Sequence, residues 1–317
     1  MLKLFSDIFD HSEDSPSRLP SSLVDAVIER SVDGTDPRLR IVSGYKKSLK
    51  KSVIHAADYI IGLIESLPAP VLASKATLAA DPLFAAMLYS EDVMNEVITR
   101  DAAMNEFRSL HSSREDSVTA LLVAHRTEKH GFGYGKVGDQ VIKDVPQTTV
   151  SFEQRQLIEP NFDENDTRRL LQRRAFDHLL SVALEHIVDR REEREALAVR
   201  RALLRSKLDI LHRSSGFSQH TSMDEQVKLQ DDLADIERQL EALGPSEDVL
   251  AGNLDTVVDV LSAAESHMWL EDKVLCLDRF YVVHDKPESS APPIVFKDLH
   301  DSRGRQVSVL MLEIQPG

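Results

Sequence analysis

A long stretch with helical periodicity, residues 163–243, constrains this fold more than any other feature. In its second half, apolar residues recur at alternating spacings of four and three: Leu229, Leu233, Ile236, Leu240 and Leu243. This spacing is typical of the seam along which two helices pack in a coiled coil. A polar segment around Gly216 interrupts the stretch once, between 212 and 222. We therefore predict two antiparallel helices that join near Gly216.

The first half of the stretch carries a matching seam. Its apolar positions between Leu197 and Leu211 pair with those between Leu229 and Leu243, because the residue numbers of facing layers have a nearly constant sum. Each helix of this arm has about 15 residues, or roughly 22 Å. Before Arg190 the apolar face becomes broader, which favours packing in a globular core. The residues of that broader face are Leu170, Leu171, Phe176, Leu179, Leu180, Leu184 and Ile187.

The remaining chain divides by pattern into helical and strand-like segments. Residues 1–112 read as a helical region, 113–160 as a β-meander, 161–268 as the long helix, arm and a following helix, and 269–317 as C-terminal strands. Helix starts are expected at Asp36, Asp81 and Ser90, because Asp and Ser are good N-cap residues and proline suits the first turn. One helix is expected from Arg38 to Leu67, and a last one from Asn253 to His267.

The strand-like segments lie far apart in the sequence. Residues 118–127 form an apolar run rich in β-branched side chains. Residues 140–145 are expected to return as a second strand and 147–153 to form a third, with Pro146 marking a bend or an edge strand. Residues 273–284, 294–296 and 306–314 are the other candidates. Since a strand needs a neighbour, we predict one mixed or antiparallel sheet built from both segments. The fold class is therefore α+β, mainly helical, with a helical-hairpin arm.

Charge and cysteine content bound the function. The chain has 317 residues and a formal net charge of −15. An acidic chain repels phosphate backbones, so we predict no nucleic-acid partner. The single cysteine, Cys276, excludes a disulfide framework. The apolar runs are too short for a membrane span or a signal peptide, so the expected location is the cytoplasm. No metal or cofactor motif is present, and none is predicted.

A glycine-rich stretch is the best candidate for a small-molecule site. Gly131, Gly133 and Gly135 alternate with Phe132 and Tyr134, so an extended chain places all three glycines on one face. That bare face admits a flat ligand or a close backbone. The flanking candidate polar groups are His125, Arg126, Lys129 and His130. The stretch lacks the ending of a phosphate-binding loop and the spacing of a dinucleotide fingerprint. A bulged hairpin with a packing role is the alternative.

Two further features suggest contact with charged or apolar surfaces. The first is a group of cations in residues 38–51, a segment without acids, and it comprises Arg38, Arg40, Lys46, Lys47, Lys50 and Lys51. It predicts either contact with phosphate, anionic lipid or an acidic protein, or an ordinary solvated helix face. The second is an apolar face in residues 1–10, typical of an in-plane membrane anchor or of a helix docked on the body.

These observations support two main hypotheses and a weaker third. The first is an intracellular interaction or scaffold protein that binds a protein partner, or a second copy, through its arm. The candidate partner-binding residues are Arg201, Arg205, Gly216 and Phe217. The second is a small-ligand-binding protein or an enzyme with its site at Gly131–Gly135. The third is peripheral membrane association through the N-terminal helix. No catalytic motif identifies an enzyme.

Overall fold

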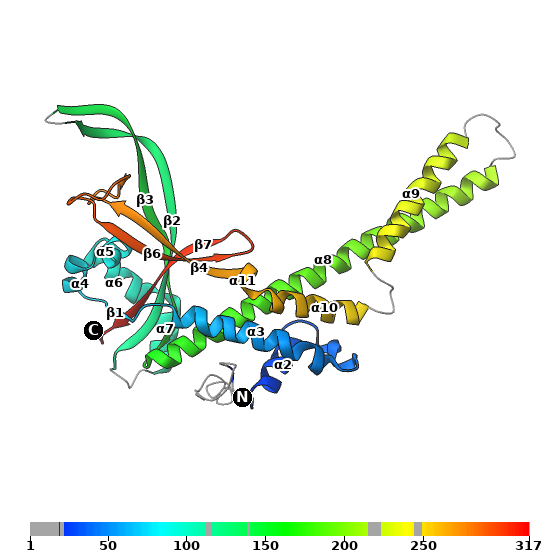
Figure 1. Ribbon diagram of the computed structural model, residues 1–317, viewed down its shortest axis with the longest axis horizontal. Coiled ribbons are helices and arrows are strands. Elements are labelled where there is room, and N and C mark those ends of the chain that lie inside the picture. Colours follow the sequence, from blue (N-terminus) through cyan, green and yellow to red (C-terminus); the bar gives the residue numbers. More distant parts are fainter. Residues whose placement is uncertain are drawn as a thin grey trace. The chain divides into compact units, whose positions relative to one another are not determined.

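The structure, a computed structural model, describes residues 19, 22–111, 116–137, 140–214, 223–243 and 249–316 (Figure 1). It has the predicted α+β fold with one sheet and a helical hairpin. The chain forms two compact units. Unit 1 comprises Met1–Pro20, Ala57–Phe176 and Ala264–Gly317, and unit 2 comprises Ser21–Ala56 and Asp177–Ala263. Our division of the chain into four successive regions stays a prediction.

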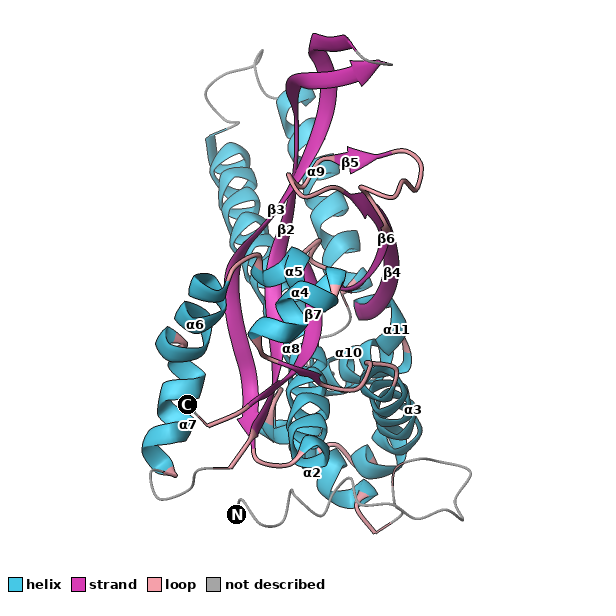
Figure 2. Cartoon of the chain, turned by 90° about the vertical axis from the view of Figure 1, so that its left-hand side faces the viewer, coloured by secondary structure: helices cyan, strands magenta, loops and turns pink. Residues whose placement is uncertain are grey.

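The sheet of unit 1 joins two distant segments of the chain, as predicted. Its strands are β1 (Val71–Leu72), β2 (Val118–Val137), β3 (Gln140–Asn161), β4 (Met268–Leu277), β5 (Val283–His284), β6 (Pro293–Asp301) and β7 (Gln306–Ile314). Their order is β3-β2-β7-β6-β4-β5 with antiparallel neighbours (Figure 2). In addition, β1 pairs in parallel with β7. The central contact is the pairing of Val118–Ala124 with Ser308–Ile314.

Strand β1 corrects the expectation that residues 1–112 are entirely helical. Pro68 and Pro70 keep the chain extended beyond α3 (Tyr45–Glu65). The chain then reaches β7 next to Leu312 and Glu313, where β6 no longer pairs with it. The backbone N–H of Ala73 donates to the carbonyl of Glu313 at 2.7 Å. A short, weakly patterned strand of this kind is specified by a free sheet edge, which the local sequence does not show.

Strand β3 corrects the predicted division into two strands at Pro146, whereas the alternative that Pro146 marks an edge strand agrees with the structure. It is one strand of 22 residues that pairs with β2 through Phe132↔Pro146. Proline has no backbone N–H group to donate. It is tolerated here because β3 is the last strand in the sheet order, so no further strand requires a hydrogen bond from that position. Three register shifts interrupt the ladder, and each contains a residue with positive φ in β3: Asp144, Gln154 and Glu159. Such bulges increase local twist. The predicted turn at Gly138-Asp139 lies outside the described residues.

The strong twist brings the two ends of the sheet together. The backbone N–H of Val150 in β3 donates to the carbonyl of Tyr281 at 2.9 Å, and Thr149 forms a bridge with Val282 beside β5. On the enclosed face, the rings of Phe152 and Phe296 stack at 5.3 Å. The core of unit 1 therefore lies inside a curled sheet.

Four short helices cover this core from one side: α4 (Lys75–Ala80), α5 (Pro82–Leu88), α6 (Glu91–Arg100) and α7 (Ala102–Leu110). Their buried side chains include Phe84, Met87 and Met104. The starts predicted at Asp81 and Ser90 are confirmed, because their side chains accept hydrogen bonds from backbone N–H groups of the first turn.

The helix expected from Arg38 to Leu67 is two elements. A short 3-10 helix, η2 (Pro37–Ile41), precedes α3, and Gly44 between them has φ of 79°. Glycine reaches this left-handed conformation without the steric cost that other residues pay. The helical period continues across the break, so hydrophobic spacing alone did not reveal it. The start at Asp36 is confirmed, since its side chain accepts from the N–H of Arg38.

Unit 2 is helical. It contains α2 (Val24–Asp33), the first part of α3, most of α8 (Glu164–Ser214), α9 (Met223–Ala242) and α10 (Val249–Ser262). The last predicted helix is interrupted, because α10 ends at Ser262 and the four-residue α11 (Ala264–His267) follows. Gly34 ends α2 close to α8, and a Cβ atom there would lie 2.7 Å from Cδ1 of Leu180. A small residue is therefore needed at that contact.

The broad apolar face of α8 is buried, as predicted. Leu171, Phe176, Leu179, Leu180 and Ile187 are each less than 9% exposed. The exceptions are Leu184, at 38% exposed, and Leu170, which is half-buried. The pattern before Arg190 therefore identified core residues correctly in most positions, because a helix that packs on several neighbours must be apolar over a wide arc.

Candidate functional site

The glycine stretch lies in β2, beyond the part of that strand that pairs with β7. From His125 onward, the described pairing of β2 is with β3, so the two strands form a ribbon. Because side chains alternate along a strand, the predicted polar residues fall on two faces. His125 and Lys129 share the glycine face, whereas Arg126 and His130 share the face of Phe132. The ribbon therefore does not bring the four groups around one ligand.

The glycine face is only partly open. A Cβ atom at Gly131 would meet nothing within 4 Å. At Gly133 it would lie 2.0 Å from Oε1 of Gln147, whose amide covers that glycine. The Nε2 atom of Gln147 donates to the carbonyl of Tyr134 at 2.8 Å. The Gln147 side chain thus covers the glycine face at Gly133, and ligand binding at Gly131–Gly135 stays a prediction.

Three of the four candidate polar side chains, Arg126, Lys129 and His130, contact partners within the protein. Arg126 is the most buried of them, with its side chain 5% exposed, and its Nη1 atom lies 2.6 Å from Oδ2 of Asp298 as an ion pair without hydrogen-bond alignment. Asp298 also accepts from Ser308 at 2.7 Å and from Gln306 at 2.9 Å. The sequence did not predict this network, because β6 and β7 are far from β2 in the chain and come close to it only when the sheet forms.

Two of the remaining polar groups, His130 and Lys129, make weaker contacts. Nδ1 of His130 is 2.9 Å from Oγ1 of Thr148 across the ribbon, and Nζ of Lys129 is 3.8 Å from Oε1 of Glu153. Both lysine and glutamate are exposed, so their pairing contributes little to stability. Within the described ranges, no group of three or more His, Cys, Asp or Glu residues could hold a metal ion.

A groove of about 1290 Å³ lies between α6, α7 and the outer edge of β3. Asp101 closes part of that edge. Its Oδ1 atom caps α7 by accepting from the N–H of Met104, and its Oδ2 atom accepts from the N–H of Leu157, both at 2.9 Å. Arg155 is bound in the same wall, where it donates to the carbonyl of Met87 at 2.6 Å. These side chains support the wall, and we assign the groove no ligand.

A second cavity, of about 760 Å³, lies within unit 2 where α8 passes η2 and α10. Two arginines of α8 line this cavity and contact neighbouring helices. Arg190 donates to Oγ1 of Thr256 at 2.8 Å and to the carbonyl of Gly252 at 3.2 Å. Arg194 donates to the carbonyl of Leu243 at 2.8 Å. Both guanidinium groups therefore hold neighbouring helix ends to α8.

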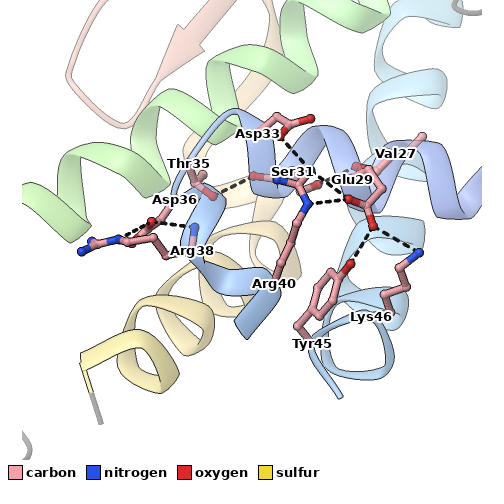
Figure 3. Close-up of polar contacts among 10 residues, drawn as sticks. All are labelled: Val27, Glu29, Ser31, Asp33, Thr35, Asp36, Arg38, Arg40, Tyr45 and Lys46. Atoms are coloured by element: carbon pink, nitrogen blue, oxygen red, sulfur yellow. Dashed lines mark hydrogen bonds and ion pairs between the residues drawn. The ribbon is translucent and has the colours of Figure 1, made fainter. Parts of the chain in front are cut away.

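Half of the predicted basic cluster is neutralised inside unit 2 (Figure 3). Glu29 accepts from the hydroxyl of Tyr45 at 2.7 Å and from Arg40 at 2.9 Å, and Lys46 lies 3.1 Å away. The hydrogen bond from Tyr45 is the largest cause that lowers the pKa of Glu29 to about 2, although burial opposes it. Arg38 lowers the pKa of Asp36 in the same way.

The other half of the cluster points to solvent. Lys47, Lys50 and Lys51 are exposed on the first turns of α3, and no residue in the described part of the chain forms an ion pair with them. The alternative of an ordinary solvated face therefore fits Arg38, Arg40 and Lys46 best, while three lysines remain for an external anion.

The helical arm consists of the outer part of α8 and α9 (Figure 1). Leu197, Leu204 and Ile236 form its buried core, against which Leu229, Leu233, Leu240 and Leu243 pack. The ion pair of Arg205 with Glu237 (2.6 Å), together with the bond from Arg194 to Leu243, shows that the two helices run antiparallel. The predicted residues of the shared seam therefore do meet.

A second apolar stripe on α8 is exposed, and the sequence analysis missed it. Val199 is 71% exposed, Leu203 55% and Ile210 62%. At 3.6 residues per turn these three positions lie roughly 140° around the helix from the seam. The available signal was their spacing of four and seven residues, which repeats the rhythm of the seam on another face. α9 occupies one side of α8 and leaves this stripe to solvent.

The predicted partner-binding residues have mixed positions. Arg205 is paired with Glu237 within the hairpin, and Arg201 is partly buried on the seam side of α8. Gly216 and Phe217 lie outside the described residues. Partner binding by these four residues stays a prediction, and the exposed stripe is the stronger candidate surface.

No protein-family profile, curated protein or solved structure matches this chain. Within the parts of the chain that the structure describes, no helix combines the length and apolar character needed to cross a bilayer.

Proposed function

We propose that this protein is an interaction protein whose helical arm binds another helix through the exposed stripe of α8. The observation that carries the proposal is the exposure of Val199, Leu203 and Ile210 on one face. Single exposed apolar residues are common and need no explanation. Three β-branched or leucine side chains at helical spacing share one face of the helix, and that pattern is how a helix presents anchors to a helical partner.

The magnitude of such a contact favours binding over chance exposure. Complete burial of one such side chain stabilises a complex by about 1.5–3 kcal/mol. These residues are already partly covered by their own helix, so about half of that remains to be gained from each. Three anchors thus supply a few kcal/mol before the cost of association. That free energy is enough for a weak, reversible association whose extent depends on protein concentration.

The test replaces the stripe with polar residues that keep the helix. The variant Val199→Thr, Leu203→Gln, Ile210→Gln is compared with Val227→Gln, which alters an apolar residue of α9 that is 52% exposed and lies off the stripe. Two measurements are made: the mass of the purified protein over a range of concentrations, and chemical cross-linking in a cell extract followed by mass spectrometry.

The proposal expects the stripe variant to lose an association that the wild type and the Val227 variant both retain. Helical content measured by circular dichroism should stay the same in all three proteins. If neither the mass nor the set of cross-linked proteins differs between the stripe variant and the control, the stripe is not an interface and the proposal is wrong.

A second candidate function is contact with an anionic lipid surface through α3. The observation that favours it is the set of three exposed lysines, Lys47, Lys50 and Lys51, which follow the 76% exposed Ile41 in the chain. Each lysine near an anionic leaflet contributes roughly 1 kcal/mol, and an apolar side chain adds to this. Sedimentation with vesicles containing phosphatidylserine should fall when the three lysines become glutamine. Equal sedimentation of both proteins would remove this candidate.

A further inference from the structure

We infer that the helix bound by the stripe is α8 of a second copy of this chain, in parallel orientation. The inference rests on the proposed function and names its partner. It is carried by the charges that flank the stripe. On one side stand the exposed acids Glu195 and Asp209, and on the other stand the exposed bases Arg200 and Lys207.

The stripe has the register of a two-stranded coiled coil. Val199, Leu203, Ser206 and Ile210 follow one another at spacings of four, three and four residues. This alternation assigns Val199 and Ser206 to one class of seam position and Leu203 and Ile210 to the other. Three of the four positions are apolar, so the seam is short and Ser206 weakens its middle.

The flanking charges then decide the orientation. In a parallel coiled coil, the residue that directly precedes the seam in each heptad of one helix faces a residue of the other helix. That facing residue has a sequence number higher by five. Glu195 of each copy therefore faces Arg200 of the other, and the contact occurs twice because of the two-fold symmetry. In an antiparallel pair, each flank meets its own kind: Glu195 approaches Asp209, and Arg200 approaches Lys207. Opposite charges attract only in the parallel arrangement.

Within one chain, Glu195 already accepts a hydrogen bond from Arg191 at 2.9 Å. Both side chains are largely exposed, at 63% and 70%, so this helical pair is weak and leaves the carboxylate accessible. Glu195 can therefore take a second guanidinium from a neighbouring helix without losing a buried partner.

The area of the contact predicts its strength. Three apolar side chains from each copy bury far less than the surface that a permanent dimer needs. We therefore expect an equilibrium between monomer and dimer in the micromolar range or weaker. Sedimentation velocity across that range should show the change in mass.

Cysteine cross-linking tests the orientation. In a Cys276→Ser background, Val199→Cys and Ile210→Cys proteins with different tags are mixed and oxidised. A parallel pair joins each variant to itself, because positions 199 and 210 of facing helices are separated by roughly 16 Å along the axis. An antiparallel pair joins the two variants to each other instead. Val227→Cys on α9 serves as the exposed control and should remain uncrosslinked.

Charge reversal provides a second test that keeps the apolar residues. Glu195→Arg alone, or Arg200→Glu alone, should weaken the dimer at least five-fold, and the double reversal should restore it. A merely destabilised helix would not be rescued by the second substitution.

The outcomes separate the two proposals. Cross-links of each variant with itself, together with rescue by the double reversal, support the inference. Cross-links between the two variants, or failure of the rescue, overturn it. A purified protein that remains monomeric, while the stripe variant still loses a partner in the cell extract, overturns the inference and leaves the proposed function in place. No change in either measurement rejects both.

Discussion

Leu203 and Leu204 are adjacent in α8 and point about 100° apart around it, one on the stripe and one in the seam, which allows a matched test of the register of the arm. Leu204 is 7% exposed in the seam, whereas Leu203 is 55% exposed on the stripe. Replacing leucine with alanine removes three carbon atoms, worth about 2.4 kcal/mol when fully buried. Because both variants change the same atoms at neighbouring sites, helix propensity contributes equally to each.

The expected losses follow from the exposed fractions. Leu204→Ala loses nearly all of the transfer free energy and leaves a cavity against Ile236, which brings the cost to about 3 kcal/mol. Leu203→Ala loses less than half of the transfer term, or about 1 kcal/mol, and opens no cavity. Hydrogen exchange should therefore accelerate about 100-fold in α9 for the first variant and about 5-fold for the second, since each 1.4 kcal/mol is a factor of ten.

The measurement is hydrogen exchange of the α9 amides, read by mass spectrometry at concentrations where the chain is monomeric. Exchange in β7, which lies in the other unit, serves as the internal reference. Equal acceleration by the two variants, or a larger effect at Leu203, would refute the register of the hairpin and with it the exposed stripe.

Three further predictions concern other parts of the chain. Glu29→Gln should lower the free energy of unfolding by roughly 1–2 kcal/mol at neutral pH after solvent screening. The pKa of Glu29 is depressed from 4.5 to about 2 in the folded protein, so this contribution is present above pH 4.5 and is lost as the pH falls towards 2. The free energies of unfolding of the two proteins, measured during acid titration, should therefore converge near pH 2. Asp298→Ala should cost about 3–5 kcal/mol in chemical denaturation, because it leaves Arg126 charged and buried, and the double variant with Arg126→Met should recover part of that loss. Asp101→Ala should cost about 2 kcal/mol in thermal unfolding, because it removes a helix cap and leaves the N–H of Leu157 without its acceptor. A surface control such as Glu106→Ala should have little effect.

The features that the sequence predicted correctly depend on neighbours in the chain. The helix starts at Asp81 and Ser90 rest on a side chain that reaches the N–H groups of the next turn. The seam of the arm rests on a repeat within two helices that a short segment connects. The composition of β2 identified a strand buried on both faces at Val118–Leu122, and the need for a partner led to β7.

The candidate site was harder to predict for a physical reason. Arg126 looked like a ligand-binding group because it follows His125 and precedes the glycine-rich stretch, but its partner, Asp298, follows it by more than half the chain. The exposure of apolar side chains on α8 was also set by a distant segment. Val199 and Leu197 are both apolar and lie two residues apart, and the position of α9 decides which of them is buried.

The sequence by itself determined the periodic elements of this protein: the long helix α8, its antiparallel partner α9 and the strands that build one sheet. These follow from backbone geometry and from spacing over a few residues. Only the tertiary structure decided that β1 completes an edge of β7, that bulges curl β3 around a core, and that one apolar face of α8 stays uncovered. Such outcomes depend on which surfaces distant segments bury, and local patterns carry no record of that competition.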